Sequence, residues 1–251
     1  MSQQSKIEWT QATWNPTVGC TKISPGCKFC YAETMAKRLQ AMKVHGYEQG
    51  FELVVLPERL EQPLKRKKPT TYFVDSMSDL FHEDVSDEFI TQVFSVIQKA
   101  KQHRFQILTK RAERLADFFK SIDPPHNAWL GVSVEDKQYG LPRIDHLRKV
   151  NAQVRFLSIE PLLEDLGEFD LSDIHWVIVG GESGSKARPM QKQWVENIRE
   201  QCLENQVKFF FKQWGGWGVD GVKRSKKKNG RLLDGRIWSE MPLSSTHSTN
   251  I

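Results

Sequence analysis

The chain has 251 residues, of which 39% are hydrophobic and 27% are charged, an ordinary composition for one large globular domain or two small ones. No apolar run approaches the roughly 20 residues that a membrane-spanning helix requires, and the opening MSQQSKIEWTQ lacks the apolar stretch of a secretion signal. These features argue against a membrane protein and a disulfide scaffold. We expect a cytoplasmic protein whose four cysteines stay reduced.

The net charge is +5, and two runs hold much of the excess: KRKK at 65–68 and KRSKKKNGR at 223–231. Such runs are typical of solvated loops. They also form the electrostatic pattern that binds a polyanion, above all nucleic acid. The composition leaves both interpretations open.

Taken in chain order, short apolar segments alternate with helical patterns. The segments 12–19 and 51–57 are candidate strands, and six clearer strands follow at 71–81, 105–111, 128–136, 154–161, 175–184 and 207–216. Helical spacing predicts helices at 32–42, 86–100, 111–120, 139–150 and 193–205, with Ser86 as an N-cap and Cys202 on a buried face. The clear strands are nearly continuous apolar runs, which is typical of a parallel sheet covered on both faces.

This alternation predicts an α/β protein with a parallel (β/α) barrel, TIM-like and complete or partial. An open doubly wound sheet is the alternative. We expect the barrel, with an N-terminal loop that carries three cysteines, at 1–217. A loop-rich basic C-terminal extension is expected at 218–251.

Each clear strand ends in polar residues, and the carboxyl ends of parallel strands build the active site of a barrel. These residues are Ser76, Ser78, Asp79, Thr109, Lys110, Arg111, Ser133, Glu135, Ser158, Glu160, Glu182, Ser183, Lys212 and Gln213. Strand ends are often polar in any protein. So many charges beside apolar runs nevertheless indicate the lining of one shared cavity.

Three cysteines, Cys20, Cys27 and Cys30, lie in the stretch GCTKISPGCKFCYAE at 19–33. A structural zinc site normally has four ligands, and a fourth would have to come from elsewhere in the chain. An iron–sulfur cluster with three cysteine ligands leaves one iron open, which suits chemistry rather than structural support. Thiols that only pack are a poor explanation for three cysteines among glycine and proline residues.

The CKFCY segment matches the Cys-x-aromatic-Cys half of the radical S-adenosylmethionine (SAM) signature, although the first gap has six residues rather than three. Nearly the whole chain resembles a phage-borne family of uncharacterised, radical-SAM-like three-Cys-motif proteins. The resemblance runs through TWNPTVGCTKISPGCKFCYAE, SMSDLFHEDV, LTKRAERL, GVSVED, FLSIEPLL, VIVGGESG-KARPM (177–190), FFFKQWGG and LLDGRIWSEMP.

The resemblance implies a [4Fe–4S] cluster on Cys20, Cys27 and Cys30, with SAM on the open iron. It also implies an external electron donor and, for some members, a three-Cys-motif partner protein. The candidates for SAM are Ser76, Ser78, Asp79, Ser133, Glu135, Glu160, Gly180, Gly181 and Glu182, and those for the substrate are Lys110, Arg111, Lys212, Gln213 and Trp214. Gly180 and Gly181 are equally well explained as a glycine-rich turn, and no catalytic residue is assigned.

The first functional hypothesis is therefore a radical SAM-type enzyme that generates a 5′-deoxyadenosyl radical to modify an unknown substrate, such as a nucleotide or nucleic acid. The alternative is a non-catalytic zinc or iron–sulfur module that docks nucleic acid or a partner protein. A redox-sensing cluster protein is a third interpretation. The acids at the strand ends count against docking, because acids at a cavity mouth repel phosphates.

Overall fold

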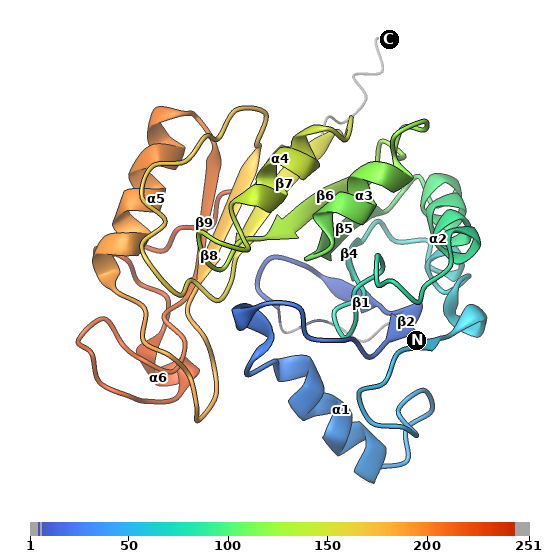
Figure 1. Ribbon diagram of the computed structural model, residues 1–251, viewed down its shortest axis with the longest axis horizontal. Helices are drawn as coiled ribbons and strands as arrows, with labels where there is room; N and C mark the ends of the chain where they lie inside the picture. The colour runs from blue at the N-terminus through green and yellow to red at the C-terminus, as the bar shows by residue number, and fades with distance from the viewer. Residues whose placement is uncertain (1–4, 6, 244–251) are drawn as a thin grey trace.

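The computed structural model describes residue 5 and residues 7–243. Its main element is a parallel sheet of seven strands, which curves into a half-barrel with β1 and β9 at its edges (Figure 1). In sheet order the strands are β1 (Ala12–Trp14), β4 (Thr71–Val74), β5 (Arg104–Thr109), β6 (Ala128–Ser133), β7 (Val154–Ile159), β8 (Trp176–Gly180) and β9 (Lys208–Gln213). The predicted α/β fold with a partial parallel barrel is confirmed.

Four helices cover the outer face of the sheet (Figure 1). They are α2 (Asp87–Lys99), α3 (Ala112–Phe118), α4 (Pro142–Arg148) and α5 (Lys192–Glu204). Their apolar residues pack with those of the strands into one core, in which Cys202 is fully buried. Ser86 caps α2 as predicted, since its side chain accepts a hydrogen bond from the Phe89 amide.

The two weaker strand candidates differ from the prediction. Only β1 joins the sheet, because Pro16 follows it closely and has no amide hydrogen to continue the ladder. The chain then forms β2 (Thr17–Val18), which pairs antiparallel with β3 (Val54–Val55) in a separate ribbon. The segment 51–57 therefore adds no strand to the half-barrel.

The helix α1 (Tyr31–Ala41) packs on this ribbon rather than on the outer face of the sheet. Ala32 and Ala36 of α1 share a small apolar cluster with Val18 and Leu56. Three short 3-10 helices lie nearby in the chain, namely η1 (Pro25–Cys27), η2 (Pro57–Arg59) and η3 (Pro63–Lys65). No helix within the described residues is long and apolar enough to cross a bilayer.

The inner face of the half-barrel carries a layer of aromatic side chains toward the amino ends of the strands. The rings belong to Trp9, Phe73, Trp129, Phe156, Trp176 and Phe210. The Trp176 ring lies 6.1 Å, centroid to centroid, from both Trp9 and Trp129. Because side chains alternate along a strand, Ser133, Ser158, Gly180 and Lys212 lie on this same inner face, closer to the carboxyl ends. An apolar floor therefore lies beneath a polar rim.

The C-terminal extension is packed onto the sheet within its described part. Trp238 lies in the main core against Phe209, with ring centroids 5.8 Å apart, and Leu233 is fully buried. The extension also contains the short helix α6 (Lys226–Asn229). The expected boundary between 217 and 218 stays a prediction, and residues 244–251 lie outside the described part.

Candidate functional site

The three clustered cysteines lie in the segment 19–30, which we name the cysteine loop. It lies across the carboxyl edge of the sheet, toward which the strand arrows point (Figure 1). Gly19 opens the loop with φ +79°, and a Cβ there would lie 1.9 Å from the Glu52 carbonyl oxygen. Only glycine fits this turn. Ser78 fastens the loop to the end of β4 through a hydrogen bond to the Gly19 carbonyl, 2.6 Å long.

All three cysteines are half-buried and free of disulfides. Cys20 follows the turn, Cys27 ends η1, and Cys30 occupies the N-cap of α1. Burial raises the pKa of the Cys20 thiol to about 11, with the Asp79 charge adding to the effect. Residue 5 and residues 7–243 contain no three His, Cys, Asp or Glu side chains grouped closely enough to hold a single metal ion.

Arg111 joins the start of the cysteine loop to the end of β5. Its guanidinium donates to Cys20 Sγ at 3.6 Å and to Thr21 Oγ1 at 2.8 Å. It also pairs with Asp79 at 3.1 Å and with Glu83 at 2.6 Å. The hydrogen bond from Arg111 lowers the pKa of Glu83 to about 2. One side chain therefore connects a cysteine of the loop, the end of β4 and the end of β5.

Four carboxylates at the carboxyl edge of the sheet are each paired with a basic side chain. The four pairs are Asp79–Arg111 at 3.1 Å, Glu135–Arg143 at 2.6 Å, Glu160–Lys212 at 2.7 Å and Glu182–Arg188 at 2.6 Å. Burial would raise the pKa of Glu135, but the charges of Lys110 and Arg143 outweigh burial and hold that pKa below its usual range. The acids expected at this edge are therefore present but electrically balanced.

Two of these pairs also contact the cysteine loop. Ser24 of the loop donates a hydrogen bond to Glu135. Arg188, which lies between β8 and α5, donates to the Pro25 carbonyl at 3.1 Å, and its guanidinium lies 5.4 Å from the centre of the Phe29 ring. Together with Arg111, these contacts tie the beginning and middle of the loop to four different strand ends.

The remaining predicted residues are placed in several ways. Ser76 donates a hydrogen bond to the Asn15 side chain. Ser133 is buried, and its carbonyl accepts a hydrogen bond from Arg143. A Cβ on Gly181 would lie 2.1 Å from the Trp214 carbonyl oxygen, so this glycine allows β8 and β9 to approach each other at their ends. Gln213 donates to the Gly181 carbonyl at 3.1 Å.

Trp214 was expected to contact the substrate, and its position in the structure is different. Its ring is buried in the main core, and its indole nitrogen donates to the Leu232 carbonyl at 2.8 Å. Alternation would have placed residue 214 on the inner face with Phe210, but β9 ends at Gln213, and the Trp214 ring packs instead against Phe211 of the outer face, with ring centroids 4.9 Å apart. The ring therefore offers no stacking surface at the cavity.

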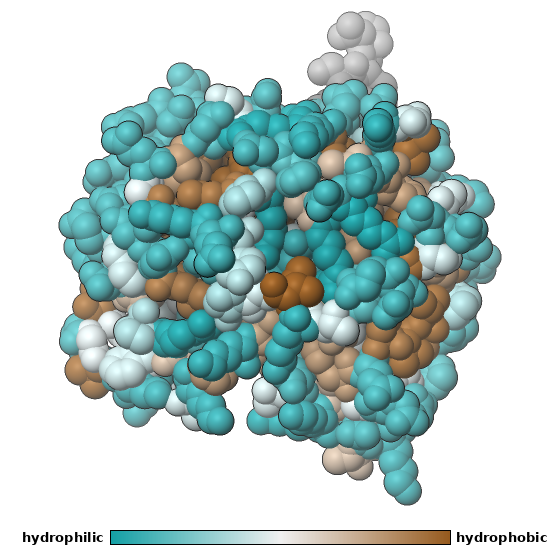
Figure 2. All heavy atoms as spheres, in the orientation of Figure 1, coloured by the Kyte–Doolittle hydropathy of each residue, from teal (hydrophilic) through white to brown (hydrophobic). Residues whose placement is uncertain are grey.

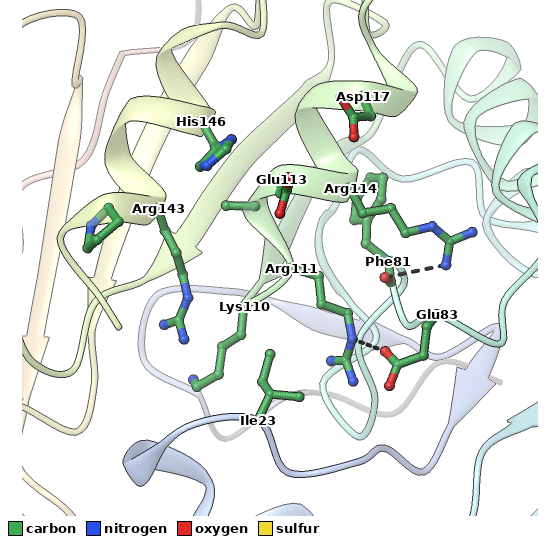
Figure 3. A pocket seen from close by; sticks show the side chains of 12 residues that line it. Ile23, Phe81, Glu83, Lys110, Arg111, Glu113, Arg114, Asp117, Arg143 and His146 are labelled. Atoms are coloured by element: carbon green, nitrogen blue, oxygen red, sulfur yellow. Dashed lines mark hydrogen bonds and ion pairs between the residues drawn. The ribbon is translucent and has the colours of Figure 1, made fainter. Parts of the chain in front are cut away.

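A cavity of about 480 Å³ lies between the cysteine loop, the end of β5, and the helices α3 and α4. Figure 3 shows the side chains of Lys110 and Arg143 both extending toward the cysteine loop, which carries Ile23. A second hollow, of about 770 Å³, lies on the other side of the loop between Cys20, α1 and the segment 49–55. Hydrophilic side chains surround the central depression of this face (Figure 2).

Sequence reasoning missed Arg143 and Arg188. Neither arginine follows a strand directly, and each acquires its role from a partner on another element. Arg188 and Pro25, for example, are 163 residues apart in the chain. The only local signal was the position of Arg188 soon after the GGESG segment.

Comparison with solved structures shows the same fold in spore photoproduct lyase. One mutant of that protein alone and one mutant with dinucleoside spore photoproduct each align with a TM-score of 0.50 and 15% sequence identity. Each alignment covers 80% of this chain and 63% of the other chain, so this protein spans less than two thirds of the length of those structures. No curated protein matches the chain. A family model described as "Protein of unknown function (DUF5131)" matches residues 4–242, and the chain belongs to that family.

Proposed function

We propose that this protein is a radical SAM-type iron–sulfur enzyme. The observation that carries the proposal is the position of three free, half-buried cysteines in one loop over the carboxyl edge of a parallel half-barrel. That edge is where barrel folds place their reacting groups. The fold shared with spore photoproduct lyase supports the proposal at the level of architecture.

The donor set suits the proposed cofactors. Cys20, Cys27 and Cys30 would hold a [4Fe–4S] cluster, and three thiolates leave one iron free for another ligand. When bound, the cluster and SAM supply one-electron cleavage of the sulfonium, which yields methionine and a 5′-deoxyadenosyl radical, with the electron coming from an external donor.

The chain itself would position the cofactors and exclude water. Arg111, Ser24 and Arg188 hold the cysteine loop against the sheet, so the thiols have a defined place before any metal binds. The buried aromatic layer closes the half-barrel beneath the polar rim, and a dry site protects a reactive radical from side reactions. Of the candidate SAM-binding residues, Ser133 and Glu160 lie on the inner face, above this aromatic layer.

The substrate class proposed is a nucleotide or nucleic acid. Lys110 supports it, because its ammonium group has no hydrogen-bond partner within the described residues and lies beside the 480 Å³ cavity. An ammonium group beside a cavity favours an anionic substrate. Arg111 is committed to its own carboxylates, so it serves the loop rather than the substrate.

The test is SAM cleavage by protein reconstituted with iron and sulfide without oxygen. After reduction with dithionite and addition of SAM, mass spectrometry should detect 5′-deoxyadenosine. Cys27→Ala should abolish both the product and the iron–sulfur absorbance. Cys202→Ala is the matched control, because it removes a thiol that is buried in the core, and it should retain both signals.

Absence of product together with one tightly bound zinc per chain would overturn the proposal in favour of a non-catalytic module. An oxidant-responsive cluster that binds no SAM would overturn it in favour of a redox sensor. Both results are read from metal analysis and SAM binding, which do not depend on turnover.

A further inference from the structure

The described C-terminal extension is the most basic part of the chain. Residues 218–243 contain seven basic and three acidic side chains, a net charge of +4 out of +5 for the whole protein. Six of the basic residues form what we name the basic wing: Lys223, Arg224, Lys226, Lys227, Lys228 and Arg231. The positive charge of this protein is therefore concentrated on one small segment.

We propose that the basic wing binds the phosphate backbone of a nucleic acid and brings the polynucleotide to the mouth of the half-barrel. This inference rests on the proposed function and deepens it, because it selects a polynucleotide over a free nucleotide or small metabolite. A polynucleotide is long enough to contact the wing and the mouth at once.

The wing is attached to the loop that follows β8, directly beside the site. Lys223 Nζ donates to the Ser185 carbonyl at 2.6 Å, and the Trp217 indole donates to the Ala187 carbonyl at 2.7 Å. The Gly216 amide donates to the carbonyl of Glu182, one of the four paired carboxylates, at 2.7 Å. In Figure 1, α6 lies on the same side of the sheet as the cysteine loop.

Cations and aromatic rings follow one another from the cysteine loop to the wing. Lys28 and Arg188 lie over the half-exposed Phe29 ring at 5.5 and 5.4 Å from its centre. Lys223 lies 5.2 Å from the centre of the half-exposed Trp217 ring. Surfaces that bind single strands combine cations for phosphates with rings on which bases stack.

Two charges of the wing are available for phosphate. Arg224 is paired with Asp220, and Lys226 with Glu8. Lys227 and Lys228 are exposed, and neither has an ion-pair partner among the described residues. A pair of unpartnered lysines releases counterions from a polyanion most effectively, which is the main source of non-specific nucleic-acid affinity.

The four acids at the carboxyl edge of the sheet do not repel an approaching nucleic acid. The sequence suggested that they would repel phosphates, but each of the four is neutralised by its own basic partner. The net field beside the wing is therefore set by the lysines. A nucleic acid fits better than an anionic membrane, because α6 has only four residues and presents no apolar helical face.

The test compares two double charge reversals by fluorescence anisotropy with a fluorescein-labelled single-stranded oligonucleotide. Lys227→Glu with Lys228→Glu removes the unpartnered lysines of the wing. Lys67→Glu with Lys68→Glu is the matched control, since these exposed lysines precede β4 at the amino end of the sheet. Titrations at salt concentrations from about 50 to 200 mM give affinity and salt slope for both variants and the unmodified protein.

We expect the wing variant to bind about tenfold more weakly or worse at low salt, with a salt slope smaller by about 2, and the control to stay close to the unmodified protein. Equal effects of the two variants, or no effect of the wing variant, would overturn the proposal. Binding of vesicles rich in phosphatidylserine without oligonucleotide binding would also overturn it. Anisotropy requires no turnover, and it is repeated on Cys27→Ala, so failure of SAM cleavage and failure of this inference are separate results.

Discussion

Asp75 allows a sharp test of how β2 is held against the end of β4. This carboxyl group is 3% exposed and follows β4 with φ +53°. Its Oδ1 accepts a hydrogen bond from the Thr17 amide at 3.0 Å, whereas Oδ2 has no hydrogen-bond partner among the residues that the structure describes. Burial raises the pKa of Asp75 to about 8, although the bond from Thr17 opposes the shift and the charge of Asp79 adds to it. The carboxyl group is therefore protonated in the folded protein at neutral pH.

The sign of the pH effect follows from proton binding. Between pH 4 and about 8 the folded protein keeps a proton on Asp75 that the unfolded chain has released. The contribution of Asp75 to the free energy of unfolding is therefore largest below pH 4 and falls as pH rises through this window. Each pH unit corresponds to about 1.4 kcal/mol, and the whole shift to something on the order of 5 kcal/mol.

Asp75→Asn keeps an oxygen for the Thr17 amide and removes the ionisation. The free energy of unfolding, measured by urea denaturation, should rise relative to the unmodified protein by about 1.4 kcal/mol for each unit between about pH 5.5 and 7.5. Taking the difference between the two proteins cancels the opposing contributions of histidines. The exposed carboxyl Asp117, changed to Asn, is the control and should show no such trend. Parallel pH profiles for Asp75→Asn and the unmodified protein would refute the reasoning.

Three further predictions concern the loop, the sheet edge and the inner core. Arg111→Lys removes the guanidinium that donates to Cys20 Sγ, so the potential of the proposed [4Fe–4S] cluster, measured by redox titration of the reconstituted protein, should fall, because donors to sulfur stabilise the reduced cluster. An unchanged potential would count against this contact. Gly181→Ala places a Cβ 2.1 Å from the Trp214 carbonyl and should cost about 1–3 kcal/mol or more in urea denaturation, whereas wild-type stability would contradict the close approach. Phe156→Ala should cost about 3–5 kcal/mol by the same measurement, and a loss below about 1 kcal/mol would show that the inner face is loosely packed.

Much of the fold was predictable because it depends on local patterns. The six clear strands are nearly continuous apolar runs, and burial on both faces requires such runs wherever a parallel sheet is covered. The helix at 86–100 begins at Ser86 because a side-chain oxygen there satisfies a free amide. The segment 51–57 was harder to place, since two valines pair equally well with a ribbon or with a sheet edge. Only contact with β2 decided between them.

The site was predictable only in part. The polar strand ends were visible in the sequence, and alternation placed several of them on the inner face. Their partners were not visible, because Arg143 and Arg188 come from segments whose position depends on the packing of other elements. Trp214 shows the opposite case: its position after β9 favoured the cavity, but the ring rotates into the core, where its indole finds the Leu232 carbonyl.

The sequence by itself determined the parallel α/β architecture, the crowding of three thiols into one loop and the concentration of positive charge near the C-terminus. Each of these follows from composition or from spacing over a few residues. The tertiary structure decided which charges cancel, which rings are buried and which basic segment lies beside the mouth. These outcomes depend on side chains far apart in the chain, whose energies of pairing and burial exist only once the sheet has brought them into contact.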